Sequence, residues 1–372
     1  MKKQLIKPDF SNNIINISAT LAQFLGCPND KPTLPALEKE LEKGYKNVVF
    51  LILDGLGMNP AHINLDEDSF LMRNVKQVLT SVFPSTTTNA TTTYLTNKYP
   101  MEHGWFGWSL YFEELKRAVD IFPCRESFTG EPVEKSFVKS TLPVEPYYKK
   151  AKSDYCSNVV VPEYWDNDYE NRYVWNTVPQ MFEHIRTVCK KDGKQFVYVY
   201  CSEPDSIMHR YGVSSAEARR VISDLNDGIE ALYAELTDTL FIISADHGQI
   251  DVDEQIKIYE DGELTAMLEW PPFLEARAAA FKVKKDCREK FVEAFNRKYG
   301  EDFKLFKVED LIKDNYFGGN LSSGHAKRLG DYIAVGTTNK IMQLTPLSHP
   351  FKGHHTSLTE EMEVPLIFIG RK

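Results

Sequence analysis

The sequence of 372 residues has no long apolar run. No segment approaches the roughly 18 consecutive apolar residues that a membrane-spanning helix needs. The N-terminal stretch 1–18 starts with basic residues, but Asp9 and several asparagines interrupt it before any apolar stretch of signal-peptide length can form. We therefore expect neither a membrane anchor nor an export signal.

Cysteine is sparse, and no two cysteines are spaced as a CxxC pair. A disulfide framework is typical of short secreted chains, whereas scattered thiols in a long chain suit a reducing compartment. We expect structural, reduced cysteines and a cytoplasmic location. The six residues are Cys27, Cys124, Cys156, Cys189, Cys201 and Cys287.

A basic excess is also missing, since 44 Lys and Arg stand against 53 Asp and Glu and give a net charge of -9. Binding a polyanion normally needs a basic surface, so nucleic-acid polymers are not expected partners. A small phosphorylated or nucleotide-like substrate stays compatible, because bound metal cations can reverse the charge locally. The composition does not predict an oligomeric state.

Short, almost continuously apolar runs predict buried parallel strands, and helical patterns lie between them. The alternation predicts an α/β fold, namely an α/β/α sandwich with a central, mostly parallel sheet and an inserted smaller cap lobe. The expected strands are 47–53, 196–200, 240–244, 331–336 and 365–370, and the clearest helices are 214–236 and 284–300.

The expected catalytic core comprises residues 1–250 and 350–372, and residues 251–349 form the expected cap lobe. Residues 105–175 differ from the rest of the core because they are rich in aromatic residues and show little periodicity. Their aromatic side chains could stack on a substrate group or anchor a long loop, and the sequence leaves both interpretations open.

Asp and His residues stand next to the ends of the predicted strands. Asp54, the pair Asp205 and His209, and the pair Asp246 and His247 follow strands, and the late pair His354 and His355 stands just before the last strand. Each alone could be a turn or capping residue. Together they lie where α/β sheets bind ligands, and Asp carboxylates with neutral imidazoles are ligands that Zn²⁺ prefers. Three aspartates and three histidines would suffice for two ions.

The stretch "SVFPSTTTNATTTYLTNKYPMEHG", residues 81–104, holds seven threonines. Pro84 ends an extended segment and Ser85 is a good helix N-cap, so the threonines could form the first turns of a helix. A hydroxyl there would lie where helix N–H groups favour an anion. The alternative from composition alone is a threonine-rich surface helix.

Five segments in this order resemble the alkaline phosphatase superfamily, and within it the type I phosphodiesterase/nucleotide pyrophosphatase family. The resemblance covers the core strands but not residues 105–175 or 251–349. The segments are "FLILDGLG", "FPSTTTNATTTYLTNKYPMEHG", "SEPDSIMHRYG", "SADHGQI" and "GHHTSLT" followed by "VPLIFIG".

The resemblance implies a site with a threonine nucleophile and two metal ions, each held by three protein ligands. It assigns Thr87 as nucleophile and bridging ligand, Asp54, Asp246 and His247 to one ion, and Asp205, His209 and a late histidine to the other. The G-x-H pattern favours His355 over His354. The family usually has an asparagine three residues after the nucleophile. Here that position is Ala90, so Asn89, one place earlier, is the candidate phosphate donor.

The resemblance implies a two-metal phosphoester hydrolase with zinc as the default ion and manganese or iron as alternatives. No obvious phosphate-clamping arginine stands near Thr87, which favours a diester or nucleotide-type substrate. A phosphomonoesterase or a phosphonate hydrolase on the same core is the nearest alternative. A metal-bound, non-catalytic binding protein is the alternative from another class.

Overall fold

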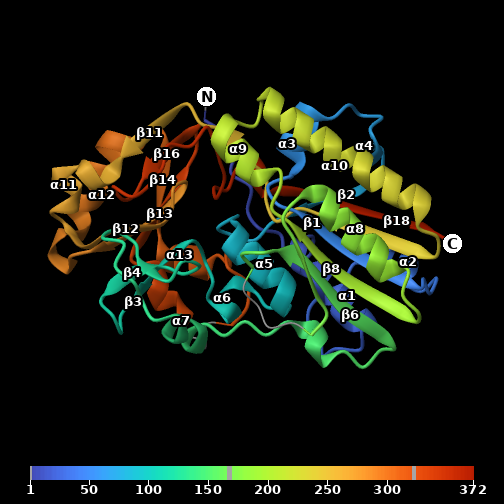
Figure 1. Cartoon of the computed structure of the whole chain (residues 1–372). Coiled ribbons are helices and arrows are strands. Elements are labelled where there is room, and N and C mark those ends of the chain that lie inside the picture. The colour runs from blue at the N-terminus through green and yellow to red at the C-terminus, as the bar shows by residue number, and fades with distance from the viewer. Residues whose placement is uncertain (1, 166–169, 321–323) are drawn as a thin grey trace.

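A seven-stranded sheet forms the larger part of the computed structural model, which describes residues 2–165, 170–320 and 324–372 (Figure 1). Strands β9, β1, β8, β6 and β7 are parallel, whereas β18 is antiparallel to both of its neighbours. The sheet order is β2 (Val75–Thr80), β18 (Glu363–Arg371), β9 (Thr239–Ser244), β1 (Asn47–Leu53), β8 (Lys194–Cys201), β6 (Tyr155–Pro162) and β7 (Arg172–Trp175). The expected α/β fold with a mostly parallel central sheet is confirmed.

Helices cover both faces of this sheet, which explains why its central strands are apolar on both sides. All seven residues of β1 are buried. Figure 1 shows α8 (Val178–Cys189) and α10 (Ala216–Glu235) on one face, and α1 (Ile14–Phe24) and α5 (Thr87–Thr96) on the other. A strand buried on both faces needs no polar alternation, so its sequence is a continuous apolar run.

A second, antiparallel sheet of four strands forms a smaller lobe. Its strand order is β12 (Leu268–Glu275), β13 (Ala278–Val283), β15 (Tyr332–Gly336) and β14 (Phe303–Lys307). We expected residues 331–336 to be a buried parallel strand, and this expectation is wrong. β15 is flanked by antiparallel β13 and β14, and its burial in that sheet produces the same apolar run as burial in a parallel one.

The aromatic segment after residue 104 packs with the smaller lobe rather than with the central sheet. It contains β3 (Ser109–Phe112), β4 (Arg117–Asp120), β5 (Arg125–Glu126) and α7 (Lys135–Thr141). Phe106 and Leu110 share one hydrophobic cluster with Phe273 and Ile333. The smaller lobe is thus assembled from two stretches of the chain. The expected domain boundaries, 1–250 with 350–372 and 251–349, stay a prediction.

A buried ion pair joins the two lobes. Arg277, in the turn between β12 and β13, and Glu361, just before β18, have fully buried side chains. The Arg277 Nε atom donates to Glu361 Oε1 at 2.6 Å, and one terminal nitrogen donates to the carbonyls of Thr338 and Lys340. These bonds fix the smaller lobe against the end of the central sheet.

The remaining helices and strands, apart from the 12-residue helix α12, are short. None of the helices in the described part of the chain has the length and hydrophobicity needed to cross a membrane. The elements are α2 (Pro35–Leu41), α3 (Met58–Asn64), α4 (Phe70–Arg73), α6 (Pro100–His103), α9 (Asp205–Tyr211), β10 (Ile250–Asp251), β11 (Glu254–Lys257), α11 (Gly262–Thr265), α12 (Arg288–Tyr299), α13 (Val308–Lys313), β16 (Lys340–Gln343) and β17 (Gly353–His354).

Candidate active site

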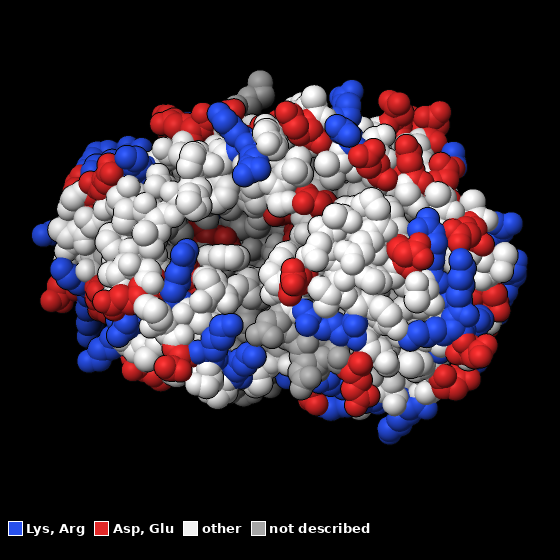
Figure 2. Space-filling model, in the orientation of Figure 1, with Lys and Arg blue, Asp and Glu red and all other residues white. Residues whose placement is uncertain are grey.

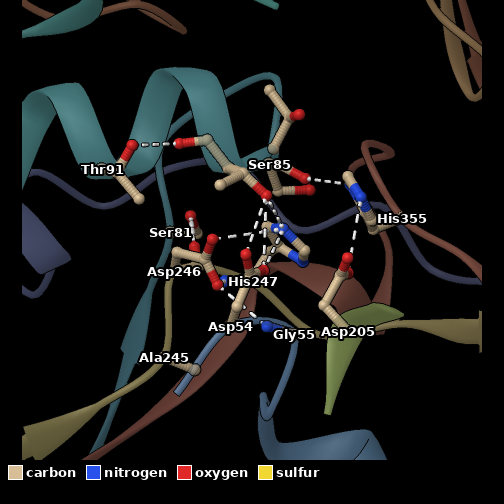
Figure 3. A network of polar contacts seen from close by, with 12 residues as sticks. Asp54, Gly55, Ser81, Ser85, Thr91, Asp205, Ala245, Asp246, His247 and His355 are labelled. Carbon is tan, nitrogen blue, oxygen red and sulfur yellow. Dashed lines mark hydrogen bonds and ion pairs between the residues drawn. The ribbon is translucent and has the colours of Figure 1, made fainter. Parts of the chain in front are cut away.

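The ends of three parallel strands bring the predicted acidic residues together. Asp54 follows β1, Asp205 opens the helix beyond β8, and Asp246 lies two residues beyond β9. Since Leu53 pairs with Cys201 in register, these strands end at the same edge of the sheet. Figure 3 shows the three carboxylates converging there, with His247 and His355 beside them.

Thr87 contacts the first group of candidate ligands. It is the first residue of α5, and Thr86 is the N-cap. The Thr87 hydroxyl oxygen lies 3.3 Å from each carboxyl oxygen of Asp54 and 3.2 Å from Nε2 of His247. His247 Nε2 is in turn 3.4 Å from Asp246 Oδ2. One hydroxyl, two carboxylates and one imidazole therefore share a small space.

The second group comprises Asp205, His209 and His355. His209 Nε2 lies 3.4 Å from Asp205 Oδ2, and His355 Nε2 lies 3.8 Å from Asp205 Oδ1. Asp205 also offers an oxygen within 4.8 Å of ligand atoms of Asp54 and His247. The two groups therefore adjoin through Asp205. His354 belongs to neither group among the described residues.

Backbone carbonyls orient the three histidines. The Nδ1 atoms of His209, His247 and His355 lie 2.8, 3.0 and 3.1 Å from the carbonyl oxygens of Gly353, Gly248 and Ser85, respectively. A carbonyl only accepts, so each Nδ1 carries a proton, and Nε2 is the ring nitrogen left to present a lone pair. Burial and the neighbouring imidazoles lower the pKa of His355 well below its usual range, which keeps the ring neutral.

The acidic side chains lack basic partners, and this fits bound divalent cations. Burial and the nearby carboxylates of Asp246 and Asp205 raise the pKa of Asp54 well above its usual range. Within the described residues, no Lys or Arg forms an ion pair with these three aspartates. Asp246 Oδ2 is buried and has no hydrogen-bond donor there. Buried carboxylates of this kind are stable only when a positive charge compensates them.

Two polar partners of the aspartates were not predicted from the sequence. The Tyr200 hydroxyl donates to Asp54 Oδ2, and the Gln249 amide donates to Asp205 Oδ1. Tyr200 lies at the end of β8, and from the sequence a tyrosine in an apolar strand is indistinguishable from an ordinary core residue. Gln249 lies two residues beyond His247, inside the recognised motif, and that proximity was the available signal.

The position of Asn89 does not support its expected role as a phosphate donor. Its side chain is fully buried, its amide donates to the Pro84 carbonyl at 2.9 Å, and it does not line the cleft described below. Asn89 sits two residues into α5, on the side that packs on the chain before the helix.

A cleft of about 1000 Å³ opens between the two lobes and contains the site. Its lining includes Thr87 and Asp205 from the core, and Trp108 and Phe122 from the aromatic segment. Trp108 and Phe122 are 43% and 44% exposed, with ring centroids 5.8 Å apart. Figure 2 shows the hollow, with acidic side chains inside it. The cleft has room for a substrate much larger than phosphate.

Glu275, at the end of β12, also lines the cleft, and no pattern in the sequence pointed to it. Its Oε1 atom accepts hydrogen bonds from the Thr86 hydroxyl at 2.8 Å and from the Trp108 amide at 2.7 Å. Burial raises the pKa of Glu275 to about 7, although these two hydrogen bonds oppose the shift.

A sequence model of the type I phosphodiesterase / nucleotide pyrophosphatase family matches residues 48–355. The chain belongs to this family. As a member it is a hydrolase that acts on phosphoric ester bonds, and the expected family is confirmed. No curated protein sequence matches the chain.

Solved structures show the same fold at low sequence identity. Murine ectonucleotide pyrophosphatase / phosphodiesterase 5 is 18% identical, with a TM-score of 0.62 over 87% of this chain and 88% of that one. An inactive variant of the murine protein in complex with AMP has 18% identity and a TM-score of 0.59 over 87% of both chains. Phosphonoacetate hydrolase from Sinorhizobium meliloti 1021, in complex with phosphonoacetate, has 14% identity and a TM-score of 0.59 over 87% and 90%.

Proposed function

We propose that this chain is a two-metal phosphodiesterase or nucleotide-pyrophosphatase-like enzyme that uses Thr87 as its nucleophile. The observation that carries the proposal is the place of the Thr87 hydroxyl. It lies at the start of a helix, 3.2 Å from His247 Nε2 and 3.3 Å from both Asp54 oxygens, and it lines the cleft between the lobes.

The proposed ligands divide into two sets. Asp54, Asp246 and His247 would hold one ion with Thr87 as a bridging ligand, while Asp205, His209 and His355 would hold the other. Mixed carboxylate and imidazole sites suit zinc, with manganese or iron as alternatives. When bound, the two ions would supply positive charge that acidifies a hydroxyl and stabilises a leaving oxygen.

In the proposed reaction, the Thr87 oxygen attacks phosphorus. The Oγ1–P bond forms, the bond from phosphorus to the leaving oxygen breaks, and a phosphothreonine results. Water then attacks phosphorus and releases Thr87 with the second product. The first amides of α5 have no intrahelical acceptor, and the helix dipole favours the phosphoryl anion there. Tyr200 and Gln249 keep the carboxylates of Asp54 and Asp205 oriented.

The cleft favours a diester or nucleotide-type substrate over a simple monoester. Arg125 is the one arginine among the described residues that line it, and its Nε lies 3.1 Å from Asp120 Oδ2. This arginine is therefore already paired and does not provide a clamp for a doubly charged phosphate. The exposed rings of Trp108 and Phe122 offer stacking area to an aromatic group of the substrate.

Purified protein, loaded separately with zinc, manganese and iron(II), tests this proposal. Ion content would be measured, and turnover of bis(p-nitrophenyl) phosphate, p-nitrophenyl phosphate and phosphonoacetate compared. We expect metal-dependent diester hydrolysis that a chelator abolishes. Preference for the monoester or the phosphonate would favour the alternative hydrolases. Stoichiometric metal without turnover of any substrate would favour a non-catalytic binding protein. The cytoplasmic location expected from the cysteines stays a prediction.

A further inference from the structure

Glu275 bonds to the protein through one of its two carboxyl oxygens. The contacts from the Thr86 hydroxyl and the Trp108 amide are both made to Oε1. Oε2 has no hydrogen-bond partner among the described residues, and it is not among their fully buried, unsatisfied atoms. Since Glu275 lines the cleft and keeps 6% of its surface exposed, Oε2 is the oxygen that stays available to a bound group.

The backbone holds this carboxylate in a fixed place. Leu274 has φ of 84°, a left-handed conformation that a branched side chain rarely adopts. Such strain persists only where the surroundings enforce it, and it is common at functional sites. Gly107 is part of that enforcement, because a Cβ there would lie 2.8 Å from the Leu274 side chain and 3.1 Å from Glu275 Cγ.

Glu275 also lies close to the reacting groups. It contacts Thr86, the residue before the proposed nucleophile, and the charge of Asp205 is among the influences on its pKa. No Lys or Arg of the described residues forms an ion pair with it. A carboxylate without an ion-pair partner among the described residues therefore lines the cleft beside Thr86, one residue from the proposed nucleophile.

We propose that Glu275 is a specificity-determining residue whose carboxylate selects singly charged phosphodiesters over doubly charged phosphomonoesters. The inference rests on the proposed function. A monoester carries one more negative charge than a diester at alkaline pH, and like charges in a partly dry cleft repel each other. Such a repulsive element is a usual way to exclude a competing substrate. Assays at pH 8.5 keep the carboxyl ionised, above its pKa of about 7.

Glu275→Gln in the zinc-loaded full chain tests this idea. The glutamine oxygen can still accept from Thr86 and Trp108, while the cleft-facing atom loses its charge. The readout is kcat/KM for methyl p-nitrophenyl phosphate divided by kcat/KM for p-nitrophenyl phosphate, two substrates with one leaving group. We expect this ratio to fall at least about tenfold, mainly through a gain on the monoester. Glu275→Asp keeps the charge and should keep the diester preference.

Glu126→Gln is the matched control. Glu126 is a buried carboxylate of the smaller lobe that bonds to Phe128 and Thr129 and does not line the cleft. It should leave the ratio unchanged. If the wild type hydrolyses the diester and Glu275→Gln keeps the wild-type ratio, this inference is wrong while the proposed function stands. An equal loss on both substrates would also overturn it, because Glu275 would then act only by positioning. A wild type inert on both esters would overturn the proposed function and this inference together.

If Glu275→Gln does not fold, anion binding is measured instead. Calorimetry on the zinc-loaded wild type and on Glu275→Asp then decides the question. Sulfate, a dianion at both pH values, and dimethyl phosphate, a monoanion at both, are the probes. Sulfate should bind at least about tenfold more weakly at pH 8.5 than at pH 6, relative to dimethyl phosphate. Equal pH dependence for the two probes contradicts the inference.

Discussion

The hydroxyl oxygen of Thr87 is equidistant, at 3.3 Å, from the two carboxyl oxygens of Asp54. Thr87 opens α5 and Asp54 directly follows the central strand β1, so this contact joins a helix N-terminus to the edge of the sheet where the other candidate ligands meet. A hydroxyl in that place can reach a phosphorus atom in the cleft and the candidate ligands at once.

Replacing Thr87 with alanine should reduce diester turnover by at least about a thousandfold, because the attacking oxygen is lost while the six other proposed ligands remain. Thr87→Ser keeps the hydroxyl and should keep part of the activity. Steady-state kinetics on metal-loaded variants, with ion content measured in parallel, check this. Full activity in Thr87→Ala would require direct attack by water.

Thr88→Val is the control for that experiment. The Thr88 hydroxyl is buried and makes no hydrogen bond within the described residues, so its removal costs little. Thr86→Ala would not serve as a second control. Thr86 is the N-cap of α5, and its hydroxyl bonds to Glu275. If Thr88→Val were inactive and Thr87→Ala were active, the assignment of the nucleophile would be wrong by one residue.

His355→Ala should weaken zinc binding at one of the two sites by at least about a hundredfold, and His354→Ala should change it much less. The reason is that His355 Nε2 faces Asp205, while His354 Nδ1 accepts the His355 amide at 2.9 Å. Zinc titration against a competing chelator measures both variants. Equal losses, or a larger loss for His354→Ala, would reassign the ligand.

Tyr200→Phe should lower zinc affinity or turnover by about 10- to 100-fold, since groups that orient a ligand are nearly as important as the ligand itself. The lost group is the hydroxyl that donates to Asp54. Tyr147→Phe is the matched control, because the Tyr147 hydroxyl is buried without a hydrogen-bond partner among the described residues. Indistinguishable zinc affinities and rates for the two variants would show that Tyr200 serves only packing.

The Arg277–Glu361 pair should make the free energy of unfolding depend on pH in the acidic range. Burial alone would raise the pKa of Glu361, but the charge of Arg277 and hydrogen bonds from Thr359 and Arg277 hold it below its ordinary value of 4.5. A depressed pKa stabilises the fold above pH 4.5, and this contribution is lost as the pH falls through the folded-state value. Glu361→Gln should cost about 3–5 kcal/mol at pH 7, because it leaves a buried guanidinium unpaired.

Urea unfolding of chelator-treated protein between pH 3 and 7 measures this effect. The difference in free energy of unfolding between wild type and Glu361→Gln should shrink as the pH falls below 4.5. Glu260→Gln, in the exposed pair with Lys257, should change stability little at any pH. A difference that grows in acid would contradict the sign of the argument.

Hydrogen exchange tests which lobe the aromatic segment belongs to. Amides in β3 and β4 should exchange together with those of β13 and β15, since Leu110 and Ile333 share one hydrophobic cluster. Cooperative exchange with β1 and β8 instead would support the expected boundaries, which assign residues 105–142 to the core.

Local patterns in the sequence predict the site better than they predict the packing around it. Asp54, Asp205 and Asp246 were found because apolar runs end there and parallel strands end at a common edge. The helix expected from residue 214 begins at Ala216 with Ser215 as its N-cap, because Ser214 bonds to Asp251 instead. That choice depends on a contact distant in sequence.

Glu275 is a clearer example of a site residue that local sequence patterns cannot predict. It lies 189 positions from Thr86, in a lobe that the family motifs do not cover, and no local pattern marks a glutamate at a strand end as a cleft residue. The assignment of residues 331–336 failed for a related reason. An apolar run reports burial but not the direction of the neighbouring strands.

The place of β18 between β9 and β2 has a consequence for how the protein is made. On the ribosome, β1, β8 and β9 emerge before β18, so β9 keeps an open, apolar edge until residues 363–371 are synthesised. The aromatic segment must likewise wait for β12, β13 and β15 before Leu110 and Phe112 are covered. Nascent chains that pause within that interval expose both surfaces. We expect chaperones to bind these chains, and we expect the chains to aggregate when synthesis stalls.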